Sequence, residues 1–342
     1  VNVPEALAWA AAFVAVDFIY YWVHRLSHEV NILWAGHVVH HSSEEYNLSV
    51  ALRQSSLHGL LTWVFYLPLA FLGVPWQMYV VCWGLNLIYQ FWIHTRAVGK
   101  LGWFEYVFNT PSLHRVHHGI NPKYIDKNHA GVFIIWDKLF GTYQEEEEEP
   151  TYGLTVPLRS WNPVWANIHA FSDIVKNFRA AATWKDKLGI LFNKPGWRPE
   201  YMGGYIAPRE VKRSQQAKYN PKTPKEVAIY ALIHFAAVVV FTLPYLKTAN
   251  NDVSGAFSVL GGAAIILSLA NLGGLMELRR WALYSEYARL TTIAVGAAAI
   301  MIGPQHFVVA AVAFAFSVVS LIWLSKMRSR FVNRGWEPLA AM

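Results

Sequence analysis

Residues 20–41 read YYWVHRLSHEVNILWAGHVVHH and contain five histidines directly after an apolar run over residues 5–23. Positions i, i+3 and i+4 of a helix lie on one face. The spacings His24-x3-His28 and His37-x2-His40-His41 can therefore direct two or three imidazoles of each motif at a single point. We predict that these residues form helices that continue from the end of an apolar span and present clustered imidazoles.

A third motif, His114-x2-His117-His118, has the same form, so eight of the fourteen histidines fall into three clusters. Neutral imidazole nitrogen is a good ligand for iron, zinc and copper. Eight imidazoles are too many for one ion and about enough for two. The predicted metal ligands are His24, His28, His37, His40, His41, His114, His117 and His118.

His94 is predicted as a ninth ligand. It ends the apolar run over 76–94, and Gln90 lies one turn earlier on the same helix face. This spacing brings another imidazole to the membrane edge where the clusters lie. The Gln90 amide is a candidate for a direct or water-mediated contact with the site.

Two carboxylates are further candidates for the site. Asp17 lies two turns before His24 inside the apolar run, where a carboxylate is costly and by default functional. Its predicted role is to accept a ligand histidine N–H and to set the tautomer; the alternative is a polar contact between helices. Glu29 could orient a ligand or bind a polar cosubstrate, and the equally weighted alternative is an i,i+4 ion pair with Arg25.

The composition predicts an integral membrane protein. Of the 342 residues, 54% are hydrophobic and 15% charged, the mean hydropathy is +0.24, and soluble domains carry about a quarter charged residues. Seven apolar runs are long enough to span or nearly span a bilayer. They cover residues 5–23, 57–74, 76–94, 227–246, 253–276, 290–304 and 306–324. The predicted fold is all-α, with a histidine-rich cytosolic cap on transmembrane helices that holds a di-metal site.

The distribution of charge predicts the orientation in the membrane. Residues 95–225 carry 19 Lys/Arg against 12 Asp/Glu, and short basic loops follow later in the chain. The positive-inside rule then places every histidine cluster on the cytosolic side. The net charge of +7 suits anionic lipid headgroups, and no basic stripe stands apart from these loops, so nucleic-acid binding is not expected. The acidic run 145–149 is expected to be a solvated loop.

The chain is predicted to have three parts. Residues 1–150 form the membrane core with the clusters, 151–225 form cytosolic amphipathic segments on the membrane surface, and 226–342 form C-terminal transmembrane helices. The single cysteine, Cys82, excludes disulfide scaffolds, cysteine zinc sites and iron–sulfur clusters. Four isolated histidines are not expected to be ligands: His58, His169, His234 and His306.

The ligand chemistry favours two irons that activate O2 against an unreactive C–H bond of a lipid. Soluble di-iron bundles use glutamates and Glu-x-x-His, which this chain lacks, and the imidazoles exceed what a closed tetrahedral zinc needs. No Gly-rich dinucleotide motif is present, so electrons come from a diffusible reductant or from an electron-donor protein. The alternative from another class is a membrane protein that handles metal without oxygen chemistry.

The three motifs resemble the eight-histidine signature of the fatty acid hydroxylase/sterol desaturase superfamily of membrane di-iron enzymes. The likeness is greatest to its ether-lipid-cleaving branch, and four stretches are similar almost word for word. They are HEVNILWAGHVVHHSSEEYNLSVALRQS (28–55), YQFWIHT (89–95), NTPSLHRVHHG (109–119) and IDKNHAGVFIIWDKLFGTY (125–143).

The resemblance implies two iron ions on the eight motif histidines, with His94 as a further ligand. It also implies hydroxylation of the ether carbon of an alkylglycerol, release of a fatty aldehyde and glycerol, and electrons from tetrahydrobiopterin. The expected location is the endoplasmic reticulum membrane, or the inner membrane in a bacterium. The alternative within the superfamily is a sterol, fatty acid or carotenoid hydroxylase or desaturase that uses ferredoxin or cytochrome b5.

Two departures from the family pattern stand out. Members carry further spans before the first histidine pair, whereas this chain starts about one span ahead of it. The family pattern also implies a tyrosine at position 129, where this chain has histidine. His129 is therefore not expected to be a ligand.

Overall fold

The computed structural model describes residues 4–211, 213–249, 255–301 and 307–331. Their regular structure is helical, and the only β contacts among them are two isolated bridges, Phe108 with Phe133 and Gly119 with Tyr152. The predicted all-α fold is confirmed. The chain divides into two compact units, one of residues 1–158 and 167–218 and the other of residues 159–166 and 219–342. The three-part division remains a prediction.

Helix α1, Glu5–Glu29, carries the first histidine pair in its last two turns. Its 25 residues reach about 37 Å at 1.5 Å per residue, more than the roughly 30 Å hydrocarbon core of a bilayer. Val30 is extended and ends the helix, and α2, Asn31–His41, begins at the next residue. This break lets α2 pack back against α1.

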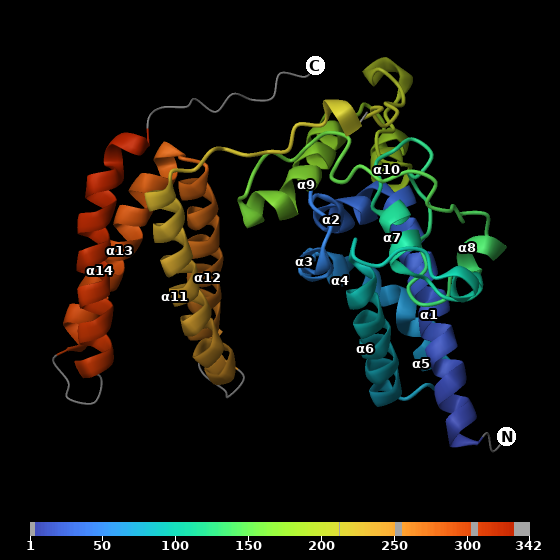
Figure 1. Cartoon of the computed structure of the whole chain (residues 1–342), viewed down its shortest axis with the longest axis horizontal. Helices are drawn as coiled ribbons and strands as arrows, with labels where there is room; N and C mark the ends of the chain where they lie inside the picture. Colours follow the sequence, from blue (N-terminus) through green and yellow to red (C-terminus); the bar gives the residue numbers. More distant parts are fainter. Residues whose placement is uncertain (1–3, 212, 250–254, 302–306, 332–342) are drawn as a thin grey trace. The chain divides into compact units, whose positions relative to one another are not determined.

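The apolar runs 57–74 and 76–94 meet at a turn and differ in structure. Residues 57–74 are divided into three short pieces, whereas α6, Trp76–Ile93, is continuous. Gly73 adopts a φ of 80° at the turn, a conformation that glycine reaches without strain. The pieces are α4 (His58–Thr62), η1 (Trp63–Tyr66) and α5 (Leu67–Phe71). Figure 1 shows α6 beside α1, and Ala12, Leu69 and Cys82 share a core there.

Shorter helices carry the other motifs of this unit. Helix α7 contains the third histidine motif and begins with Pro at its first position, after Thr110, whose hydroxyl accepts the Leu113 N–H. The short elements are α3 (Leu48–Leu52), η2 (Gly102–Tyr106), α7 (Pro111–His117), α8 (Ile135–Leu139), η3 (Glu200–Met202) and η4 (Arg213–Gln215).

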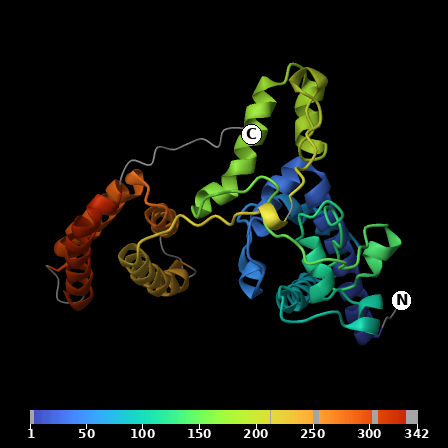
Figure 2. The ribbon, with the colours of Figure 1, turned by 45° about the horizontal axis from the view of Figure 1, so that its top comes forward.

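The amphipathic stretches after residue 150 form α9, Pro163–Ala180, and α10, Trp184–Phe192. Figure 2 shows them as two neighbouring helices joined by a short turn. They pack against α2 through a core of Ala35, Ile174, Ala181 and Ile190. Trp184 and Phe192 are exposed, as expected of segments that lie on a membrane surface, and that location remains a prediction.

The second unit consists mainly of long apolar helices. They are α11 (Lys225–Ala249), α12 (Gly255–Met276), α13 (Arg280–Ile300) and α14 (Phe307–Met327), followed by η5 (Arg328–Arg330). Neighbours in sequence lie side by side in Figure 1, and they share a core that includes Tyr230, Leu275, Leu290 and Leu324.

Four helices of the described residues are long and apolar enough to cross a membrane, so the chain is an integral membrane protein. They are Glu5–Glu29, Lys225–Thr248, Ser258–Met276 and Phe307–Arg330. The other three predicted runs correspond to the interrupted α4–α5 segment and to α6 and α13. Parts of the runs 253–276, 290–304 and 306–324, with His306, lie outside the described residues.

Candidate metal centre

The structure brings all nine predicted histidines together in two groups. The first metal group is His24, His28, His37, His41 and His117, and the second metal group is His40, His94, His114 and His118. Within each group, one nitrogen of every ring lies within 4.8 Å of the others. No ring is more than 7% exposed. Among the described residues neither group includes a carboxylate, and Asp126 Oδ1 lies outside both, 3.6 Å from His28 Nδ1.

Each HxxHH motif serves both groups. Residues four apart belong to the same group, as His37 and His41 or His114 and His118 do, whereas the third member, His40 or His117, belongs to the other. A helix turns about 100° per residue, so adjacent histidines point in different directions. Two imidazoles of each HxxHH motif therefore share one group, within the predicted two or three, and the remaining one belongs to the other group, so that the motifs link the groups.

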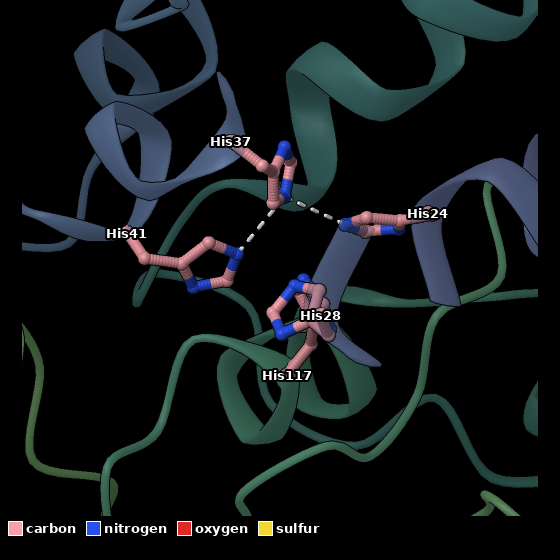
Figure 3. Close-up of side chains that lie close together, drawn as sticks. All are labelled: His24, His28, His37, His41 and His117. Carbon is pink, nitrogen blue, oxygen red and sulfur yellow. Dashed lines mark hydrogen bonds between the residues drawn. The ribbon is translucent and has the colours of Figure 1, made fainter. Parts of the chain in front are cut away.

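The ring nitrogens are spaced as ligands of a shared ion. In the first group, His37 Nε2 lies 3.1 Å from His24 Nε2 and 3.2 Å from His41 Nε2 (Figure 3). In the second group, His94 Nε2 lies 3.3 Å from His40 Nε2 and 3.0 Å from His114 Nε2. With metal–nitrogen bonds of about 2.0–2.1 Å, neighbouring ligands lie about 2.9–3.4 Å apart. The observed distances fit this range.

Several of these nitrogens have no protein partner. His28 Nε2, His117 Nε2 and His118 Nε2 are buried and make no hydrogen bond within the described residues. An unpaired buried polar atom costs about 1–3 kcal/mol. A metal ion bound by each group would relieve this cost. The residues of both groups therefore fit the metal that their donor chemistry implies.

Main-chain carbonyls orient four of the rings. In each pair an Nδ1 faces a carbonyl oxygen, which can only accept. In three of them Nδ1 therefore donates and Nε2 keeps its lone pair for a metal, whereas Nδ1 of His40 also lies 3.2 Å from the donor amide of Gln54. The pairs and distances are His24 with His129 (2.7 Å), His94 with Gln90 (2.7 Å), His117 with Lys127 (2.9 Å) and His40 with Arg53 (3.3 Å).

Burial keeps the imidazoles outside α1 neutral. It lowers the pKa of His94 to about 4. Burial first, and then the neighbouring imidazoles, hold the pKa of the other rings well below its usual value. These rings are His37, His40, His41, His114, His117 and His118. Neutral imidazole is the form that binds a metal, so the groups are ready for metal at neutral pH.

Asp17 has other hydrogen-bond partners than the ligand histidine that was predicted. Its carboxylate accepts the Asn86 amide at 2.6 Å, the Trp136 indole at 2.9 Å and the main-chain N–H groups of Val132 and Phe133. None of these described donors is a histidine, so the predicted contact with a ligand N–H is not observed. Asp17 instead joins α1 to α6 and fixes the loop whose His129 carbonyl orients a ligand ring.

The side-chain amide of Gln90 is occupied by protein neighbours. Its Nε2 donates to Asn86 at 2.6 Å, and its Oε1 accepts the Tyr20 hydroxyl at 2.7 Å. The contribution of Gln90 to the site shown here is its main-chain oxygen, which orients His94. A direct or water-mediated contact of the amide with the metal remains a prediction.

Glu29 forms the ion pair that was the alternative prediction. Its carboxylate lies 3.0 Å from Arg25 Nε, and its side chain is 28% exposed. Glu29 belongs to neither metal group within the described residues. Its role toward a polar cosubstrate remains a prediction.

The acidic run is not simply a solvated loop. Glu146 accepts two hydrogen bonds of 2.6 Å from Arg115, and the two side chains are 15% and 8% exposed. Arg115 lies in α7 and also donates to the carbonyls of Thr95 and Val98. Because Thr95 follows His94, this pair ties together the two segments that carry most of the second group. The solvated-loop prediction is wrong for Glu146.

Two histidines beside the first group were not predicted as ligands and lie outside both groups. His58 has its ring 4.9 Å from that of His37, and its Nε2 lies 3.1 Å from the Ser27 hydroxyl. His129 is fully buried. Neither shows the i,i+4 spacing, so local sequence carried no signal for this proximity.

The comparisons with known proteins agree with this geometry. Residues 9–142 match the family described as fatty acid hydroxylase. The alkylglycerol monooxygenase of Homo sapiens is 43% identical over 285 residues, which cover 82% of this chain and 63% of the relative. That of Danio rerio is 40% identical over 291 residues, covering 84% and 65%. The resemblance predicted from the motifs is confirmed.

More distant relatives extend the comparison. An ornithine lipid hydroxylase of Rhizobium tropici is 28% identical over 141 residues, which cover 41% of this chain and 43% of the relative. No solved structure matches the chain. The chain spans about 60% of the length of the alkylglycerol monooxygenases that it matches.

Proposed function

We propose, from the match of residues 9–142 to the fatty acid hydroxylase family, that the chain is a membrane monooxygenase that cleaves the ether bond of alkylglycerols. The observation that carries the proposal is the pair of buried groups of five and four imidazoles. Relatives named alkylglycerol monooxygenase at 40–43% identity support this substrate class.

The proposed metal content is two iron ions. Nine nitrogen donors exceed what two closed tetrahedral zinc sites need, and imidazole suits iron. Iron supplies the activation of O2 that attack on a C–H bond requires. The protein's part is to orient the rings through main-chain carbonyls and to keep bulk water out, since every ligand ring is buried.

The proposed reaction balances with one external reductant. One atom of O2 enters the C–H bond of the carbon next to the ether oxygen, and the other leaves as water after taking up two electrons and two protons. The resulting hemiacetal splits into a fatty aldehyde and glycerol. Tetrahydrobiopterin is the proposed electron source, and an electron-donor protein is the alternative.

The site is proposed to lie at the cytosolic face of the membrane, either the endoplasmic reticulum or a bacterial inner membrane. His24 and His28 lie at the end of a candidate span. Residues 95–225, which contain His114 and His118 of the second group, are rich in Lys and Arg, as cytosolic segments are. A lipid substrate could then keep its alkyl chain in the bilayer while its ether carbon reaches the metal groups.

A direct assay tests the proposed function. Purified, iron-loaded protein is incubated with an alkylglycerol, O2 and tetrahydrobiopterin, and the fatty aldehyde is trapped and measured. Aldehyde that depends on both O2 and pterin is expected, together with two iron ions per chain. Absence of aldehyde, or one metal ion or none per chain, would contradict the proposal.

A substrate and reductant panel decides between this activity and the superfamily alternative. Sterol, fatty acid and carotenoid substrates are supplied with reduced ferredoxin or cytochrome b5 in place of pterin. Turnover of these substrates, without cleavage of alkylglycerol, would support the alternative. The likeness to a bacterial ornithine lipid hydroxylase makes an acyl-chain substrate the first to include.

A further inference from the structure

His129 is a buried imidazole whose ring makes no hydrogen bond of good geometry. It is fully buried, and neither ring nitrogen meets the distance and angle of a hydrogen bond within the described residues, although the main chain of Asp126 lies beside the ring. Its ring centroid lies 5.0 Å from that of His28, 5.5 Å from that of His117 and 5.8 Å from that of His24. These distances approach the separations between ligand rings, such as 5.4 Å between His24 and His28. His129 therefore packs against the rings of the first metal group.

The fold places His129 there through its main chain. Its N–H donates to Asp137 at 2.8 Å, and its carbonyl accepts the His24 Nδ1–H at 2.7 Å. Asp126 and Asn128 have φ values of 57° and 55°, a region that non-glycine residues enter at a cost and that recurs at functional sites. The Asn128 amide donates to two main-chain carbonyls and so braces this turn.

His129 differs from the ligands in two respects. Three ligand rings have Nδ1 held by a main-chain oxygen at 2.7–2.9 Å, which sets the tautomer, whereas neither nitrogen of His129 makes a hydrogen bond of this geometry, although the Asp126 main chain lies beside its ring. It also lies outside the set of nitrogens within 4.8 Å of one another. A neutral imidazole always carries one donor and one acceptor, and buried polar atoms are normally satisfied. Its missing partner therefore belongs to the contents of the site.

We propose that His129 is a catalytic residue that hydrogen-bonds a small oxygen ligand, such as water or dioxygen, at the metal of the first group. The five imidazoles would hold the ion and supply it with nitrogen ligands only, which would leave room for such a ligand, and the His129 ring lies within 5.8 Å of three of the five rings. The inference rests on the metal of the proposed function and is independent of the lipid substrate and the reductant.

The side chain can be replaced while its main-chain contacts remain. His129→Phe keeps a ring of similar size but removes both polar nitrogens. His129→Asn keeps a donor and an acceptor. His58→Phe is the matched control, since it removes another imidazole beside the first group whose Nε2 already contacts the Ser27 hydroxyl.

Azide binding to the iron-loaded, full-length protein in detergent tests the inference. Azide takes the place of a small ligand on iron, and the absorbance of the complex reports its affinity without lipid or pterin. His129→Phe should retain two iron ions per chain and bind azide about tenfold more weakly or worse, as expected for loss of a hydrogen bond to a charged ligand. His129→Asn should recover most of the affinity, and His58→Phe should match the wild type.

Two results would overturn the proposal. Unchanged azide affinity in His129→Phe would make the residue a bystander, and loss of one iron ion would make it a ligand. Failure to cleave alkylglycerol with the expected azide results would count against the proposed substrate and leave this inference standing. Wild-type protein that binds no iron would refute both.

Discussion

Both compact units bury polar side chains among apolar helices, but they satisfy them differently. In the first unit, buried nitrogens of His28, His117 and His118 have no partner within the described residues. In the second, the fully buried Glu286 carboxylate accepts Tyr230 and Asn271 at 2.6 Å each, and Arg289 at 2.6 and 2.9 Å. The histidine nitrogens of the first unit are thus unpaired among the described residues, whereas the Glu286 oxygens of the second unit are paired.

The pairing in the second unit involves all four long helices. Arg289 also lies 2.9 Å from His234 Nδ1, and His234 Nε2 lies 3.1 Å from the Ser320 hydroxyl. His234 is thus a satisfied histidine, as predicted for a lone one. The comparison teaches that a charged or polar residue in an apolar helix indicates a ligand site only where its neighbours leave its atoms unpaired.

Single variants that remove one metal ligand, from either group, should have the largest effect on iron content and turnover. His37→Ala and His118→Ala should each lower the iron content by about one ion per chain and reduce turnover beyond the roughly 10–100-fold typical of outer partners. Both variants should still insert into the membrane. Metal analysis and aldehyde formation check this, and retained turnover in most single ligand variants would contradict the assignment.

Breaking the charged network of the second unit should affect stability and leave the metal in place. Glu286→Ala leaves Arg289 without its partner, which costs about 3–5 kcal/mol for a buried pair. A large fall in the melting temperature in detergent is expected, with two iron ions per chain retained. The matched control is Glu226→Ala at an exposed pair with Arg330, which should cost less than about 1 kcal/mol. Iron loss in the Glu286 variant would remove the distinction between the two units.

Weakening the clamp between Glu146 and Arg115 should affect the second metal group selectively. Glu146→Gln keeps the shape of the side chain but loses the charge, and we expect a 10–100-fold lower affinity for one of the two ions, as for other orienting partners. The control is Glu147→Gln, an exposed neighbour paired with Lys123, which should bind both ions normally. Metal titration of the stripped protein measures the two affinities. Equal weakening of both sites would refute the selective role.

Acidification should have the smallest effect, a gradual loss of stability of the metal-free protein. Burial lowers the pKa of His94 to about 4, and six further ligand rings are lowered well below the usual value. The unfolded chain takes up protons below about pH 6.5 while the folded one resists them, so the stability of metal-free protein should fall from pH 6.5 toward 4.

The Asp137 carboxylate opposes this trend, because burial raises its pKa to about 6. The seven imidazoles outnumber the buried carboxylates, so the net sign should be that of the histidines. Melting temperatures of metal-stripped protein at pH 7.5, 6.5 and 5.5 check the slope. A melting temperature that rises on acidification would contradict the buried, neutral histidines.

Much of the site was predictable because its ligands repeat at helical spacing. His37 and His41, four residues apart, must share a face whatever the rest of the chain does, and His94 followed from its place at the end of an apolar helix. The main-chain and indole contacts of Asp17, the burial of Glu146 and the contact of His129 with His24 were not predicted. The partners of these residues lie 115, 31 and 105 residues away in sequence. Helix and strand periodicity predicts contacts only between residues close in sequence, so it could not indicate these.

The amino-acid order alone therefore determined the helical membrane class, the family likeness and which nine histidines meet, since these depend on hydropathy, local spacing and shared motifs. Only the tertiary structure decided how the nine divide into five and four, and which carbonyls orient them. It also showed that the Glu286 carboxylate of the second unit is paired with its neighbours, whereas ring nitrogens of His28, His117 and His118 in the first unit have no partner within the described residues. Such pairings depend on how distant segments pack, because a hydrogen bond forms only where packing brings donor and acceptor together.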